Sequence, residues 1–330
     1  MSYSSESTFP KSTPVSRVKE LVEALGYRKI RGLKWPGHIA SYAWYEPKDY
    51  KSYSGVELSI YRASPKGRLQ VSTRSTISRS YWDLTHQNKT LRMLRDLIGG
   101  DFVSDAGKNR YWRPAAKPPT PISSGCYLAM WRLHNALIKP SLYLSARKFE
   151  GDLAREKLTG LYFMDAMNPR LLSNNMTLPF VIAVWEEYFR AIFAAVLKYS
   201  NQRESALKRV RLSHAHLEKV LVGHVEVERA VAESFSFQRP SQICEQFRML
   251  DNRIDLAGAL RKPYKGRGVT LFDSIESSVE NRNAFVHSGE MDHRLSDSQL
   301  KTTISDFEVA ARRCYDHLGT QLKFTTSRDY

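Results

Sequence analysis

The sequence predicts an α+β domain followed by an all-α helical bundle of four to five main helices. Up to residue 103, two segments with helical spacing of apolar residues enclose three segments in which apolar and polar residues alternate, as in strands. Prolines then interrupt the chain, and after residue 124 helical spacing dominates. The 330 residues, 42% of them hydrophobic, suffice for two separate cores.

Residues 1–14 are rich in Ser, Thr and Pro, and we expect them to form a flexible tail. Residues 15–103 are expected to form a basic domain with the order α-β-β-β-α. Its first helix has Val18 and Val22 on one face and ends at Gly26, and Gly99 ends the second. The expected elements are a helix over 16–25, strands over 39–45, 55–61 and 68–73, and a helix over 80–98.

This order of elements matches several small α+β modules, among them the double-stranded RNA-binding domain, which is also basic. The match is one of order alone, because the second helix opens with Ser80-Tyr81-Trp82-Asp83 and no Lys-rich cluster. A compact basic domain with another recognition role is the favoured interpretation. The aromatic residues of this domain could stack on bases or fill the core of the sheet, and we favour the core because that role is commoner. They are Trp35, Tyr42, Trp44, Tyr45, Tyr61 and Trp82.

Positive charge is concentrated in the first third of the chain. The whole chain has a formal net charge of +16. Residues 1–123 hold 21 Lys and Arg against 10 Asp and Glu, a net of +11, while the remaining 207 residues hold 29 against 24. Such a balance favours a polyanionic partner, most simply RNA, bound through the N-terminal domain and the segment after it.

Residues 104–124 contain four prolines and predict a basic, Pro-rich linker before an all-α domain over 125–330. In that domain we expect Pro140 to end the first helix. Apolar residues cover most of the circumference over 178–199, which predicts a helix deep in the bundle. The expected helices cover 127–137, about 154–161, 178–199, 205–218, 225–234, 241–250, 269–286 and 299–322.

Several function classes are disfavoured by what the chain lacks. Three dispersed cysteines form no disulfide framework or zinc motif, and no signal peptide or apolar run of membrane-spanning length occurs, so we expect a cytoplasmic, soluble protein. His214, His216 and His224 lack ligand spacing for a metal. No Gly-rich phosphate loop is present either, so no metal and no cofactor is expected. Of the adjacent Glu186 and Glu187, one is expected to be exposed and the other to be buried in a structural ion pair, with Arg282 or Arg248 as its partner.

The most informative stretch is Arg282-Asn283-Ala284-Phe285-Val286-His287. On a helix, Asn283 and His287 are i,i+4 neighbours and share a face, and the long Arg282 side chain can reach the same volume. The Ala, Phe and Val between them are expected to supply the buried side. A guanidinium, an amide and an imidazole suit binding a phosphate and moving a proton. A polar trio that only caps and solvates a helix end is the alternative.

This stretch resembles the Arg-x(4–6)-His signature of HEPN domains in its Arg-Asn-x-x-x-His form. The resemblance covers about residues 165–325 and excludes the basic N-terminal domain. It implies a small helical bundle that acts as a homodimer, as a metal-independent RNA endonuclease with Arg282, Asn283 and His287 as catalytic residues. It also implies a toxin–antitoxin, abortive-infection or other antiviral defence role, with an inhibitor or antitoxin protein as a further partner. Some toxin members carry a Tyr two residues after the His, where this chain has Gly289.

Such a trio can cleave RNA without a metal if the 2′-hydroxyl attacks the adjacent phosphorus. One His cannot easily be both base and acid in one step, whereas a dimer supplies two copies of His287. Arg282 would stabilise the charged transition state, and Asn283 would orient His287 or a phosphate oxygen. The alternatives are a HEPN-type module that binds RNA or protein without cleavage, and a dimerisation scaffold.

Overall fold

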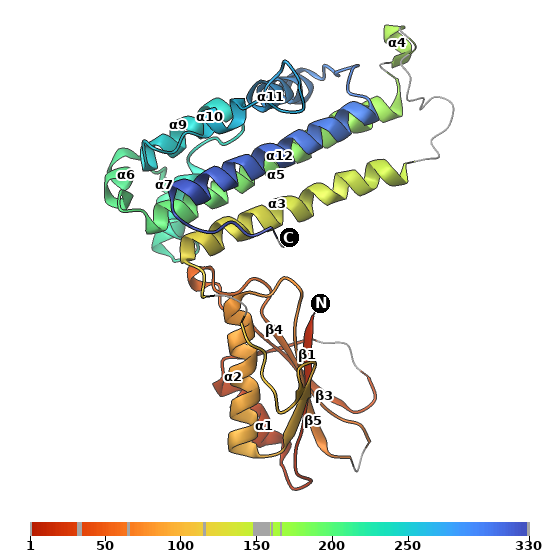
Figure 1. Cartoon of the computed structure of the whole chain (residues 1–330). Helices are drawn as coiled ribbons and strands as arrows, with labels where there is room; N and C mark the ends of the chain where they lie inside the picture. Colours follow the sequence, from red (N-terminus) through yellow and green to blue (C-terminus); the bar gives the residue numbers. More distant parts are fainter. Residues whose placement is uncertain are drawn as a thin grey trace. The chain divides into compact units, whose positions relative to one another are not determined.

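The computed structural model describes residues 2–31, 35–64, 67–114, 117–147, 159, 161–165 and 167–328. The chain divides into two units, Met1–Ser124 and Gly125–Arg328. An antiparallel sheet with two long helices makes up the first unit, and the second is largely helical (Figure 1). The expected change from α+β to all-α along the chain is therefore confirmed.

Within the described residues, the first unit contains a seven-stranded antiparallel sheet in the order β2-β3-β4-β5-β1-β6-β7. The strands are β1 (Tyr3–Thr8), β2 (Arg28–Ile30), β3 (His38–Trp44), β4 (Val56–Arg62), β5 (Leu69–Ser75), β6 (Asp101–Ser104) and β7 (Gly107–Lys108). A short 3-10 helix, Lys48–Tyr50, lies between β3 and β4. The strands expected over 39–45, 55–61 and 68–73 are present as β3, β4 and β5. They could be predicted because apolar residues that face the core alternate along them with polar ones.

The tail expected over 1–14 is wrong for its first half. Residues Tyr3–Thr8 form β1, which lies inside the sheet and pairs with β5 on one side and β6 on the other. Its inward side chains include Ser5, whose hydroxyl lies 2.7 Å from the Thr73 hydroxyl. Because the inward residues of this strand are the serines Ser5 and Ser7, it carries no alternation of apolar residues.

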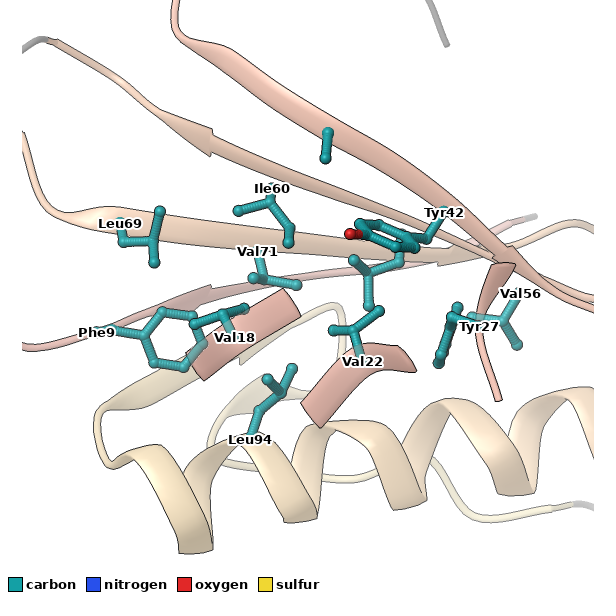
Figure 2. Packing of buried hydrophobic residues seen from close by; sticks show 12 residues of the cluster. Phe9, Val18, Val22, Tyr27, Tyr42, Val56, Ile60, Leu69, Val71 and Leu94 are labelled. Carbon is teal, nitrogen blue, oxygen red and sulfur yellow. The ribbon is translucent and has the colours of Figure 1, made fainter. Parts of the chain in front are cut away.

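Helices α1 (Val15–Ala24) and α2 (Tyr81–Ile98) pack on one face of the sheet. Figure 2 shows Val18 and Val22 of α1 and Leu94 of α2 meeting Ile60 and Val71 of the central strands. The start of α2 is a capping box, in which Ser80 accepts from the Asp83 N–H while the Asp83 carboxylate accepts from the Ser80 N–H. The capping box explains why α2 begins where the sequence pattern predicted.

The linker expected over 104–124 is shorter in the structure. Residues up to Lys108 belong to β6 and β7, and Trp112 is buried against Leu84, Leu91 and Phe102. Helix α3 (Pro121–Ala146) then begins with a proline at its first position, where no backbone hydrogen bond is lost. Although the segment is rich in proline, the packing of Trp112 holds this part of it against the first unit.

The second unit has more helices than the four to five expected. Its described helices are α3, α4 (Tyr162–Asp165), α5 (Pro169–Tyr199), α6 (Arg203–Arg209), α7 (His214–Leu221), α8 (Val227–Glu233), α9 (Pro240–Leu250), α10 (Leu256–Arg261), α11 (Leu271–Ser288) and α12 (Asp297–Gln321). The helix expected over 205–218 is divided into α6 and α7, and α10 was not expected. The helix expected around 154–161 falls mostly outside the described residues.

Two prolines lie inside long helices. Pro140 does not end α3, which continues to Ala146, and Pro179 lies inside the 31-residue α5. A proline removes one backbone hydrogen bond, but Pro140 is buried, and tertiary packing of the helix offsets that loss. The Ser141 hydroxyl also donates to the Leu137 carbonyl at 3.0 Å, inside the same turn.

Helix α5 is the centre of the second unit, as its apolar circumference predicted. Trp185, Phe189 and Phe193 are buried on it, and their rings contact Phe307 of α12 and Phe247 of α9. Figure 1 shows α5 and α12 running along each other. An aromatic core of this kind is rigid and fixes the helices that surround it.

The ion pairs of Glu186 and Glu187 differ from those expected. Glu186 pairs with Arg190 at 2.7 Å, and Glu187 pairs with Arg190 and Arg229 at 3.0 and 2.8 Å. Arg248 instead lies 3.4 Å from Asp255. Since neither glutamate uses Arg282, that side chain is left for other contacts.

In the described part of the chain, no helix is both long enough and apolar enough to cross a membrane.

Candidate functional site

Helix α11 carries the Arg282–His287 stretch and has two dissimilar halves. Thr270 caps its start by accepting from the Asp273 N–H, and Leu271, Ile275 and Val279 anchor its first half in the core. Its second half has no buried residue up to Gly289, whose φ of +71° ends the helix in a left-handed conformation. The polar stretch is therefore displayed on a helix that its other half holds in place.

The motif side chains differ in exposure. Arg282 and Asn283 are half-buried, and His287 is exposed in the last turn. The apolar residues between them were expected to form the buried side, and this expectation is wrong: Ala284 and Phe285 are half-buried, and Val286 is 48% exposed. The face that Val286 occupies is thus open to solvent in a single chain.

Arg282 and Asn283 are brought together in the structure. The Nη1 of Arg282 donates to Oδ1 of Asn283 at 2.8 Å. Among the described residues Arg282 forms no ion pair, and its buried Nε has no hydrogen-bond partner. An amide oxygen accepts a hydrogen bond but carries no charge, so the positive charge of Arg282 is not neutralised.

Three carboxylates near Arg282 along the chain, those of Glu276, Glu280 and Asp292, already have partners. Arg239 lies 3.0 Å from Glu276 and 3.2 Å from Glu280, and both glutamates precede Arg282 on α11 by less than two turns. Asp292 accepts from Asn281 at 2.8 Å and from the Arg294 N–H at 2.9 Å. Other half-buried arginines of this unit do contact carboxylates: Arg190, Arg203, Arg229, Arg239, Arg267 and Arg312. Arg282 departs from that pattern, as does the half-buried Arg313, which donates to the Lys262 and Pro263 carbonyls. An unneutralised guanidinium is suited to an anion.

His287 is not joined to the other two residues. Within the described ranges it makes no hydrogen bond, so the expected orientation of His287 by Asn283 is not formed in the single chain. Both nitrogens of an exposed, unbonded imidazole are open to a proton or a phosphate oxygen. The structure thus pairs the guanidinium with the amide and leaves the imidazole free at the helix end.

A second set of residues holds the loop after α11 and was not foreseen. Asn175 of α5 accepts from the Asp292 N–H at 2.9 Å and donates to its carbonyl, and Asn281 donates to the Asp292 carboxylate. Beside this cluster lies a pocket of about 210 Å³ between α11 and α12. Asn175 and Asp292 are 117 residues apart, so no local spacing could have indicated their contact.

The histidines His214 and His216 lie on α7, with His224 just beyond it. His216 Nδ1 lies 2.9 Å from the Ser213 hydroxyl and its Nε2 lies 3.9 Å from Glu233. Across the described ranges, no three His, Cys, Asp or Glu side chains are grouped so that they could hold a metal ion.

Comparison of the chain with family models, with curated proteins and with solved structures finds no match.

Proposed function

We propose that the protein is a metal-independent RNA endonuclease whose reaction centre is built around Arg282, Asn283 and His287. The observation that carries the proposal is the state of Arg282. Its guanidinium is half-buried and unneutralised, it is bonded to the Asn283 amide, and the exposed His287 imidazole follows in the last turn of the same helix. Burying a charge without an opposite charge is costly, so it indicates that an anion completes the site. The resemblance of the stretch to the HEPN signature supports RNA phosphate as that anion.

The chemistry follows from the three groups. A base removes the proton of a ribose 2′-hydroxyl, the 2′-oxygen attacks the adjacent phosphorus, and the bond to the 5′-oxygen breaks as an acid protonates it. The products are a 2′,3′-cyclic phosphate and a 5′-hydroxyl. Arg282 stabilises the extra negative charge of the transition state through its N–H groups, and Asn283 holds the guanidinium in position.

His287 has to serve as base or acid, and one copy does not serve easily as both within a single step. A second copy of the chain would bring a second His287 to the same phosphate. The exposed Val286 beside His287 gives such a partner an apolar contact next to the reacting groups. The active species in this proposal is therefore a homodimer, with the basic N-terminal unit as the part that retains RNA.

The test is cleavage of a mixed RNA pool by the full chain in EDTA. We expect cut RNA with 2′,3′-cyclic phosphate and 5′-hydroxyl ends, and no cleavage of DNA of the same sequence. His287→Ala should lower the rate by about 10²–10⁴-fold, the usual contribution of a general acid or base. Arg282→Ala should lower it by about 10²–10³-fold.

Two variants serve as matched controls because each removes the same side chain from an exposed position outside the motif: His224→Ala and Arg294→Ala. Both should cleave at the parent rate. A requirement for Mg²⁺ would refute the mechanism, while intact RNA in every buffer would leave a binding module or a dimerisation scaffold as the function. Cleavage that survives His287→Ala would remove that residue from the site.

A further inference from the structure

One face of the sheet in the first unit is covered by α1 and α2, and the other is not. Along β4, Val56, Leu58 and Ile60 point to the helices and are buried, whereas Glu57 and Ser59 alternate with them and point away. The register continues this second face across the sheet. Ser41, Ser59 and Ser72 are paired neighbours on β3, β4 and β5.

This uncovered face is hollowed. A depression of about 450 Å³ lies over the three serines, large enough for a nucleotide. Its lining residues are Ile30, Arg31, Trp35, Ser41, Tyr42, Glu57, Leu58, Ser59, Ser72 and Arg74. The row of hydroxyl groups gives it several donors and acceptors side by side, and aliphatic side chains are few.

An aromatic side chain stands at the rim of the hollow. Trp35 is 42% exposed, and its ring centroid lies 4.4 Å from that of His38 and 6.4 Å from that of Tyr61. His38 is itself held by Ser41, with Nε2 2.9 Å from the hydroxyl. Trp35 was expected to be core on sequence grounds. Instead, its neighbours orient a ring that is largely accessible, as stacking on a base requires.

Two arginines lie in the same hollow without carboxylate partners. Arg74 stands directly opposite Glu57 in the β4–β5 register, yet in the described ranges neither residue forms an ion pair. Arg31 also lines the hollow, and its side chain is exposed. A further carboxylate on this face, that of Glu6, is bonded to the Gln70 amide. The two guanidinium groups are thus free for an anion and line the same hollow as an accessible indole.

We propose that this hollow binds a single-stranded RNA segment, with one base stacked on Trp35, the adjoining phosphates on Arg31 and Arg74, and ribose hydroxyls on the serine row. Stacking on an exposed aromatic ring and charge pairing with the backbone are the two contacts by which proteins hold single strands. The 2′-hydroxyl is both donor and acceptor, as serine is, and distinguishes RNA from DNA. The net charge of +11 over residues 1–123 matches a polyanion.

The choice of RNA rests on the proposed function, whereas the binding surface itself is separate from the cleavage site. The experiment therefore uses the full chain with His287→Ala as the parent, so that RNA is bound and not cut. Fluorescence anisotropy would measure binding of a labelled unstructured RNA of twelve or so nucleotides, about the length that one such groove occupies. DNA of the same sequence and a perfect RNA duplex are the comparison ligands.

We expect Trp35→Ala to weaken binding of single-stranded RNA about tenfold, and Trp35→Phe to retain most of it, because one stacked base contributes on that order. Arg74→Ala should weaken binding several-fold and lower the slope of log affinity against log salt by about 0.7, the value for one phosphate of a single strand. Arg92→Ala on α2 removes the same charge from the helix side of the unit and should change affinity less than about twofold. DNA and duplex RNA should bind more weakly than the single-stranded RNA.

Parent-level binding by Trp35→Ala would overturn this inference, as would an equal loss in Arg92→Ala and Arg74→Ala, which would mean diffuse charge attraction. Equal binding of DNA would overturn the assignment to RNA. Thermal unfolding of each variant at the parent temperature excludes a folding defect as the cause. If the tryptophan variant loses binding while the chain with His287 intact cuts no RNA, the proposed function fails and the binding surface remains.

Discussion

Arg282 and Asn283 are joined along α11 by a hydrogen bond from Nη1 to Oδ1 of 2.8 Å, between a charged donor and a neutral acceptor. The amide fixes the guanidinium without neutralising it. A carboxylate in the same place would keep the geometry and add an opposite charge. The difference between Asn and Asp at residue 283 therefore separates a role in anion binding from a role in helix packing.

Asn283→Asp should lower RNA cleavage by about 10²-fold or more, since the charge of Arg282 would be satisfied before the phosphate arrives. The free energy of unfolding should stay the same or rise slightly, by up to about 1 kcal/mol, for a new half-exposed ion pair. Single-turnover cleavage rates and urea unfolding measure the two effects. Ser277→Asp, an exposed position on the same helix, is the control and should cleave normally. Cleavage by Asn283→Asp at the parent rate would indicate that Arg282 has only a structural role.

A buried charge pair links the ends of three helices in the second unit. Arg147, directly after α3, is bonded to Asp297 at the start of α12, and its Nη2 also donates to Asn174 Oδ1 of α5 at 2.6 Å. Asp297→Ala should lower the free energy of unfolding by about 3–5 kcal/mol, because it removes the buried carboxylate to which Arg147 and Asn174 donate. Urea unfolding measures this loss.

The matched control is Asp316→Ala, which breaks an exposed pair with Arg328 and should cost less than about 1 kcal/mol. Combining Arg147→Met with Asp297→Leu should restore part of the loss, since neither charge of this pair then remains buried. Equal stability losses for Asp297→Ala and Asp316→Ala would mean that the buried pair contributes no more than a surface pair.

The elements that the sequence predicted well are those whose buried face is apolar. Strands β3 to β5 and helices α1, α2 and α12 begin and end within two residues of the expected positions. Strand β1 was missed because its inward residues are serines, such as Ser5 against Thr73. The helical boundary at Pro140 was misplaced because packing, which depends on distant residues, outweighed a local preference.

The candidate site was predictable only in part. Local spacing brought Arg282, Asn283 and His287 to one helix, and α11 contains all three. The missing charge partner of Arg282 depends on Arg239, which lies more than forty residues earlier and takes Glu276 and Glu280. The accessible ring of Trp35 depends likewise on which face of the sheet the helices cover. Both features depend on contacts between residues that are far apart in the chain, and the local sequence pattern does not reveal such contacts.

The position of β1 inside the sheet predicts that the first residues are required for folding of the first unit. Removing residues 1–8 would leave the hydrogen-bonding edges of β5 and β6 unpaired. We expect loss of hydrogen-exchange protection throughout β4 and β5, while removal of residues 1 and 2 alone has no such effect. Unchanged protection after the longer truncation would show that the sheet does not depend on this strand.

His86 of α2 is held neutral inside the first unit. Its ring stacks on Trp44 with centroids 3.8 Å apart, and its buried Nε2 has no hydrogen-bond partner in the described ranges. Burial, together with the smaller effect of the nearby Lys89 charge, lowers the pKa of His86 from 6.5 to about 4. Between about pH 4 and pH 6.5, His86 is therefore mostly neutral in the folded chain and mostly protonated in the unfolded chain.

The sign of the pH effect follows from that difference. Above about pH 6.5 neither state protonates His86 and its contribution to stability is complete; as the pH falls toward 4, the unfolded state gains a proton and is stabilised. We expect a loss of about 1–2 kcal/mol in the free energy of unfolding between pH 7 and pH 5 from this residue, allowing for its partial exposure. His86→Phe keeps a ring against Trp44 and cannot be protonated. In urea unfolding at both pH values, the variant should lose less stability than the parent by that amount, and identical losses would mean that protonation of His86 does not control the acid stability of this unit.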